Sequence, residues 1–128
     1  SMNLTFVPSA LEKISPTWVM SDITYLDGIT TRLEDDYLRR IGSTFKGISF
    51  LGPGYPAWFE YSKDNLGAPK SGFLHTSLVK DFELIMDEGH AKLAIKTEHS
   101  IFFLESAEPV QETDEIHELM DQINALSQ

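Results

Sequence analysis

Apolar and polar side chains alternate along much of this chain, and such alternation is typical of β-strands with one buried face. Phe82, Leu84 and Met86 occupy every second position, and Leu93 and Ile95 repeat the pattern after a turn. Short polar turns separate these segments, so successive strands are expected to be antiparallel neighbours. The pattern predicts strands over residues 18–26, 45–51, 57–62, 73–86, 91–96 and 101–105. At the N-terminus it predicts a short edge strand over residues 5–7 that stops at Pro8, followed by a single helical turn over residues 9–14.

Residues 31–41 are the first segment with helical spacing. Thr31 and Glu34 are spaced as in a capping box, where each side chain bonds the main-chain N–H of the other residue. Gly42 is well placed to end the helix in a left-handed conformation. The predicted apolar face consists of Leu33, Tyr37 and Ile41, and two i,i+4 ion pairs, Asp35–Arg39 and Asp36–Arg40, are expected beside it.

Residues 113–126 form the second predicted helix. Thr113 can cap its first turn, and Asp114 and Glu115 lie where the helix dipole favours negative charge. Apolar side chains recur on one face of this helix, which is expected to pack against the sheet. That face consists of Ile116, Leu119, Met120, Ile123 and Leu126.

These elements predict an α+β fold. It consists of a mainly antiparallel β-sheet, a meander of about five to six strands, with two helices packed on it, one of them C-terminal. The chain has 128 residues, the length of one domain, so residues 1–128 are expected to form a single compact unit. Ser1 stands ahead of Met2 and is interpreted as the remnant of an expression tag.

The composition is that of a globular protein, with 41 % hydrophobic and 23 % charged residues. No cysteine is present, which excludes disulfides and thiolate metal ligands. The first residues lack the basic region and apolar run of a secretory signal. No segment approaches the roughly 20 apolar residues that span a bilayer. We therefore expect a soluble protein of the cytoplasm.

The negative charge is concentrated near the C-terminus. The net charge is −10, and residues 97–128 contain eight acids and neither Lys nor Arg. Residues 1–96 are nearly balanced, with ten bases and twelve acids. Nucleic acids and anionic membranes attract Lys and Arg, so the distribution argues against both as partners. It favours a basic protein partner instead.

No motif for catalysis is found. The chain lacks a phosphate-binding loop, a nucleophile elbow and the His-Glu-x-x-His zinc motif. Two of the histidines, His90 and His99, are expected at opposite ends of one strand, so they cannot share a metal ion. His75 and Ser77 share a face of a strand, but no third partner completes a catalytic triad. We therefore predict no enzyme activity, no metal site and no cofactor.

Aromatic side chains crowd around the turn at residues 52–56, Gly-Pro-Gly-Tyr-Pro. If residues 57–62 are a strand, Phe59 and Tyr61 share one face and Trp58 takes the other. Either a helix covers the second face, or Trp58 and Tyr55 form an exposed patch that binds a ligand or a protein. The pattern leaves both alternatives open.

The acids of the predicted C-terminal helix lie opposite its apolar face. Asp114, Glu118 and Asp121 form a ridge there, and no Lys or Arg of the same helix can pair with them. The approach to the helix extends the same charge with Glu105, Glu108 and Glu112. Such a ridge either keeps the protein soluble or docks a basic partner.

Two hypotheses of function follow. The first is a small acidic protein that neutralises a basic protein partner, in particular an immunity or antitoxin protein that blocks a nuclease-type bacterial toxin. The acids would steer association, and Tyr55 and Trp58 would anchor the contact. The alternative is a small-molecule-binding module that uses an aromatic pocket at the hairpin, with residues 64–71 as a lid.

Overall fold

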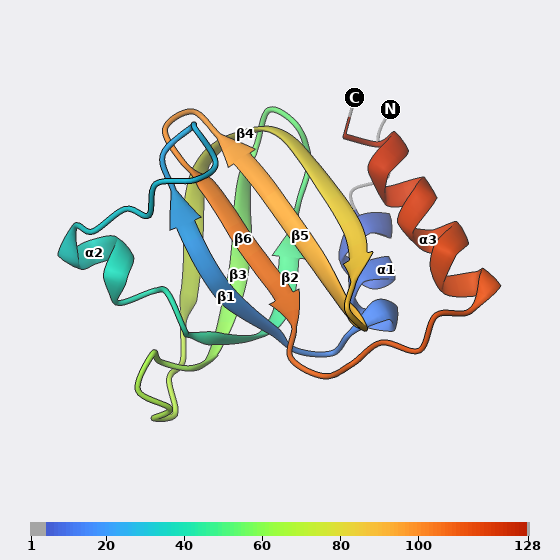
Figure 1. Cartoon of the computed structure of the whole chain (residues 1–128), viewed down its shortest axis with the longest axis horizontal. Helices are drawn as coiled ribbons and strands as arrows, with labels where there is room; N and C mark the ends of the chain where they lie inside the picture. The colour runs from blue at the N-terminus through green and yellow to red at the C-terminus, as the bar shows by residue number, and fades with distance from the viewer. Residues whose placement is uncertain (1–4, 128) are drawn as a thin grey trace.

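The computed structural model describes residues 5–127, so Ser1, interpreted as a tag remnant, lies outside these residues. Six strands and three helices make up this part of the chain (Figure 1). In chain order they are α1 (Phe6–Ile14), β1 (Trp18–Thr24), α2 (Asp35–Leu38), β2 (Thr44–Phe50), β3 (Pro56–Lys63), β4 (Phe73–Asp87), β5 (His90–Thr97), β6 (Ile101–Ser106) and α3 (Asp114–Ala125).

The six strands form a closed antiparallel barrel, which corrects the prediction of an open sheet with two helices packed on it. The antiparallel meander itself was predicted, but its first and last strands also pair. Trp18 shows the closure most directly, because it lies opposite Ser106 of β6 and opposite Phe45 of β2. Closure leaves the sheet without the two free edges that an open meander would have.

The core fills the interior of the barrel. Phe45 is fully buried there, with ring centroids 5.6 Å from Phe59 and 4.7 Å from Tyr61. Trp18 is also buried, and its indole Nε1 donates to the main-chain oxygen of Ser15 at 3.1 Å. These side chains come from β1, β2 and β3, so the core depends on pairings between segments that are separated in the sequence.

The N-terminal segment is a helix. The helical turn predicted over residues 9–14 is part of α1, whereas the edge strand predicted for residues 5–7 is wrong. Residues 7, 10, 11 and 14 are the buried positions of α1, and this spacing is that of one helical face. Pro8 was taken as a stop, but proline is tolerated in the first turn of a helix because the N–H there has no intrahelical partner. Helix α1 packs against β2 and α3 (Figure 1).

The helix predicted over residues 31–41 is reduced to α2, a single turn with no buried residue. The capping box does not form, because Thr31 is bound to β1 instead. Its hydroxyl donates to Asp22 Oδ1 at 3.0 Å, and the Arg32 N–H donates to the main-chain oxygen of Ile23 at 2.8 Å. Leu33, which was assigned to the apolar face of that helix, is 69 % exposed.

The charges of this segment also pair differently from the prediction. Arg39 pairs with Asp36 rather than with Asp35, and no carboxylate lies within 4 Å of the Arg40 guanidinium in the described part of the chain. Gly42 has φ +93°, which agrees with the left-handed conformation predicted there.

The C-terminal helix α3 agrees with its prediction. Thr113 caps it by accepting a hydrogen bond from the Ile116 N–H at 3.2 Å, and Met120 and Ile123 are buried. Helix α3 lies beside α1 at one end of the barrel and contacts β4 (Figure 1). The first half of β4 pairs with β3, whereas residues 81–87 pair only with β5. Helix α3 contacts β4 along this second half, where β3 no longer lies beside the strand.

Candidate functional site

The acidic ridge of α3 faces solvent. Asp114, Glu118 and Asp121 are all exposed, and the apolar stripe of the helix is turned toward the barrel. Within the described residues no Lys or Arg lies within 4 Å of any of these three carboxylates. Like charges that lack a cation repel one another, so the helix presents an uncompensated negative face.

The approach to α3 divides into two parts. Glu108 and Glu112 are exposed, and Glu112 Oε1 lies 3.0 Å from Nε2 of His117 on the helix. Glu105, in contrast, is a partly buried residue of β6 that lies opposite Lys92 of β5. The Lys92 ammonium forms its ion pair with Asp87 instead, so Glu105 differs from the other predicted acids in its burial and in its position on a strand. We call Glu108, Glu112, Asp114, Glu118 and Asp121 the acidic face.

The second predicted feature, the pair Tyr55 and Trp58, lies on the outside of the barrel. Phe59 and Tyr61 are buried, whereas Trp58 is 40 % and Tyr55 48 % exposed. Both side chains are exposed, so of the two alternatives the exposed patch is the one observed. Trp58 is flanked by Phe73 and His75, with ring centroids 6.0 and 4.9 Å away.

A shallow apolar hollow of about 390 Å³ opens next to Trp58. Tyr55 and Phe50 meet edge to face in its wall, with ring centroids 5.4 Å apart. Rigid aromatic rings around a hollow can receive an apolar side chain or a small apolar ligand at little cost in conformational entropy. The hollow is lined by Ser49, Phe50, Tyr55, Pro56 and Trp58.

Besides His117, two further histidines have structural partners. His90 Nδ1 lies 2.9 Å from the main-chain oxygen of Ser106 and so helps join β5 to β6. His75 stacks beside Trp58. Nowhere in residues 5–127 do three or more His, Asp or Glu side chains come together as metal ligands would.

A third feature was missed from the sequence. Arg39 and Arg40, which were assigned to ion pairs on a helix, line a pocket together with Lys70 from a distant loop. The one signal in the sequence was Gly42, which indicated a turn directly after the two arginines. The approach of Lys70 depends on the pairing of β3 with β4 and has no local signal in the sequence.

Comparisons with known proteins give no relative: no protein family, no curated protein and no solved structure matches this chain. Helices long and apolar enough to cross a bilayer are absent from the part of the chain that is described. The function is therefore inferred from the residues and their geometry.

Proposed function

We propose that this protein binds a basic protein partner through the acidic face and neutralises it. The observation that carries the proposal is the exposure of Asp114, Glu118 and Asp121 without any Lys or Arg within 4 Å in the described chain. Five acids along one helix and its approach attract a cationic surface over a distance of about 8 Å at physiological salt. The partner supplies the cations that the chain itself lacks there.

The aromatic patch supplies the anchor in this proposal. Charges at the rim of an interface increase the association rate and the specificity, whereas buried aromatic side chains hold the complex together. Tyr55 and Trp58 are half-exposed around an apolar hollow. A contact that reaches from α3 to the β2–β3 turn would use both surfaces.

A nuclease-type bacterial toxin is the partner that we propose. Enzymes that act on nucleic acid present Lys and Arg around their sites, because they must bind phosphate. An acidic face that covers those cations blocks substrate binding, and this is the action of an immunity protein or antitoxin. A chain without cysteine needs no oxidising compartment, so the proposal places the encounter in the cytoplasm.

A capture experiment from the native source tests the proposal. Tagged wild-type protein is compared with the double variant Glu118→Lys and Asp121→Lys, and retained proteins are identified by mass spectrometry. The control, Glu12→Lys and Glu98→Lys, makes the same change of charge at exposed acids outside α3. We expect the wild type and the control to retain a basic protein, and the α3 variant to lose it. Equal retention by all three would contradict the proposal.

A second candidate function is the binding of a small apolar ligand in the hollow beside Trp58. The observation that favours it is the cluster of rings from Phe50, Tyr55 and Trp58 around a space of about 390 Å³. A ligand that binds only the folded state raises the melting temperature. Screening a metabolite library should then give a stabilising compound whose effect is lost in Trp58→Ala. A compound that stabilises both proteins equally would exclude this site.

A further inference from the structure

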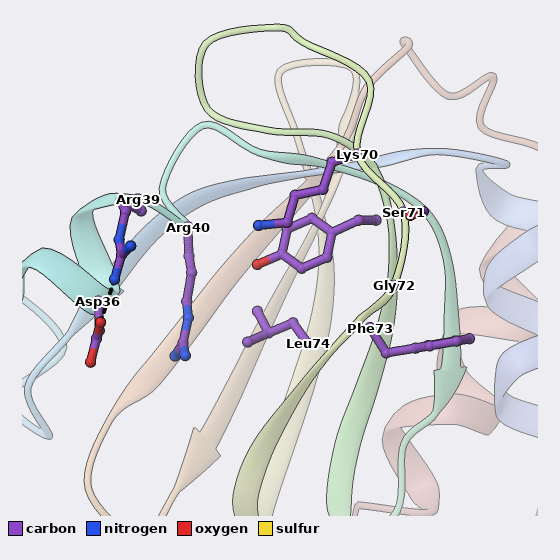
Figure 2. Close-up of a pocket in the computed structure, with 9 residues that line it drawn as sticks. Asp36, Arg39, Arg40, Lys70, Ser71, Gly72, Phe73 and Leu74 are labelled. Carbon is purple, nitrogen blue, oxygen red and sulfur yellow. Dashed lines mark hydrogen bonds and ion pairs between the residues drawn. The ribbon is translucent and has the colours of Figure 1, made fainter.

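A basic pocket of about 350 Å³ lies at the end of the barrel where β3 ends and β4 begins. The turn between α2 and β2 forms one side of it, and the loop between β3 and β4 forms the other (Figure 2). Its lining residues are Asp36, Arg39, Arg40, Tyr61 and residues 70–74.

The charge of this pocket is opposite to that of the protein. Three of the chain's ten cations line it, with Asp36 as the sole carboxylate among the lining residues. Asp36 pairs with Arg39. Arg40 and Lys70, in contrast, have no carboxylate within 4 Å in the described chain. In Figure 2 these two side chains come from different segments and border the same space.

The segments that carry Arg40 and Lys70 are held by hydrogen bonds to the barrel. Gly42 follows the arginines, and its N–H donates to the main-chain oxygen of Met20 at 2.7 Å. In the other segment, the Lys70 N–H donates to the main-chain oxygen of Ser62 at 3.0 Å. The two segments are therefore brought together by the fold and do not have to be ordered when a ligand binds, which reduces the cost of binding.

The wall of the pocket combines apolar surface with hydroxyl groups. The Lys70 ammonium lies 4.4 Å from the centroid of the Tyr61 ring, and Leu74 is buried beside it. The Phe73 ring, in contrast, points away from the pocket (Figure 2) and lies 6.0 Å from the Trp58 ring. Burial raises the pKa of the Tyr61 hydroxyl and outweighs the opposing effect of Arg40 and Arg39. That hydroxyl is therefore protonated at neutral pH and can donate a hydrogen bond.

We propose that this pocket binds a small organic phosphate monoester. The ester phosphate carries nearly two negative charges at neutral pH, which matches the two cations without a carboxylate partner, Arg40 and Lys70. Arg and Lys both bind phosphate oxygens by charge-assisted hydrogen bonds. The organic part of the ligand packs against the Tyr61 ring and Leu74. This site is distinct from the acidic face and does not depend on the proposed protein partner.

A phosphate monoester fits the pocket better than the other common anions. A carboxylate carries one charge and would leave the second cation unpaired. A nucleic acid requires a basic stripe that follows its backbone, whereas the cations here surround one hollow on a protein of net charge −10. Distant acids are screened at physiological salt, so the nearby cations determine the local potential.

Titration with phenyl phosphate, followed by NMR of the main-chain amides, tests the assignment. We expect saturable shifts at Arg40, Ser71 and Gly72, with a Kd below about 1 mM. Arg40→Gln and Lys70→Gln should each weaken binding by roughly tenfold or more, because each removes a charge-assisted bond. The control Lys80→Gln removes an exposed cation from the middle of β4 and should change the Kd by less than about twofold.

The same spectra show whether each variant is folded, since resonances outside the pocket should not move. If one variant fails to fold, the other still tests the site. Benzoate and inorganic phosphate serve as comparison probes, and each should bind more weakly than phenyl phosphate. The proposal is overturned if no saturable shift occurs at the pocket amides, if either comparison probe binds as tightly, or if Lys80→Gln weakens binding as much as Lys70→Gln.

Discussion

The side-chain amide of Asn124 on α3 pairs with the main chain of Leu84 on β4. The Leu84 N–H donates to Asn124 Oδ1 at 2.8 Å, and Asn124 Nδ2 donates to the Leu84 oxygen at 2.9 Å. Just beyond the helix, Ser127 Oγ accepts from the Phe82 N–H at 2.8 Å. In this half of β4, where β3 no longer pairs with the strand, these bonds from α3 and Ser127 satisfy main-chain groups that a neighbouring strand would otherwise bind. They also fix the helix, and with it the direction in which the acidic face points.

Replacing Asn124 should therefore destabilise the protein. Asn124→Ala leaves a donor and an acceptor of Leu84 without partners, which costs about 1 to 3 kcal/mol of unfolding free energy. The measurement is urea denaturation followed by circular dichroism. Gln122→Ala, at an exposed position of the same helix, is the control and should change stability by less than about 0.5 kcal/mol. Equal losses of stability for the two substitutions would show that the Asn124 hydrogen bonds do not stabilise the folded protein.

Arg32 holds the segment that follows β1 against two tyrosines, and it offers a second test. Its guanidinium lies between two rings, 4.5 Å from the centroid of Tyr25 and 4.4 Å from that of Tyr37. Lysine keeps the charge but not the planar stacking, so Arg32→Lys should cost about 1 kcal/mol in thermal or urea unfolding. Arg39→Lys, at an exposed ion pair, should be nearly neutral. A neutral Arg32→Lys would contradict the role given to the two rings.

Stability should decrease in acid partly through Glu34. Hydrogen bonds from the Tyr25 hydroxyl, at 2.6 Å, and from Arg32 hold the pKa of this carboxyl below its ordinary value of 4.5. The unfolded chain binds the proton more readily, so the contribution is present above the ordinary pKa and is lost as the pH falls through the folded pKa.

Comparison of urea midpoints at about pH 7 and about pH 3 checks this sign. In Glu34→Gln the stability should be lower than that of the wild type at neutral pH, and the difference should shrink in acid. Glu98→Gln, at an exposed turn, serves as the control. A difference between Glu34→Gln and wild type that stays constant with pH would rule out the proposed carboxylate bonds.

The two tryptophans should differ in fluorescence. Trp18 is 1 % exposed and Trp58 is 40 % exposed, so acrylamide should quench only part of the emission efficiently. Trp58→Phe should leave a blue-shifted emission that resists the quencher, whereas Trp18→Phe should leave emission that is quenched readily. If Trp58→Phe removed none of the accessible fraction, the aromatic patch would not be exposed in solution.

Local patterns in the sequence predicted most of the elements. Alternation located the five strands from residue 45 onward and the strand that begins at Trp18, and the Thr113 cap located α3. The barrel was not predictable, because its closure depends on the pairing of Trp18 with Ser106, residues that lie far apart in the sequence. The helix predicted over residues 31–41 was wrong for the same reason. Thr31 has the spacing of a capping box, but its hydroxyl binds Asp22, which the local sequence does not indicate.

For the candidate sites too, features within one helix were predictable, whereas features that join distant segments were not. The exposure of Asp114, Glu118 and Asp121 follows from helical spacing alone, which is why this ridge was predicted correctly as a solvent face. Glu105 was grouped with them by charge, and the structure places it on β6 as a partly buried residue, apart from the helix. The basic pocket could not be predicted, because its two sides meet only through the folded barrel.

The central claim is that the acidic face binds a basic protein, and the salt dependence of that complex tests it most directly. With the captured partner, the affinity should fall by roughly tenfold or more between about 50 and 200 mM salt. Glu118→Lys with Asp121→Lys should weaken binding and flatten this dependence. Affinity that does not change with salt, or a dependence that the double variant leaves intact, would contradict the claim.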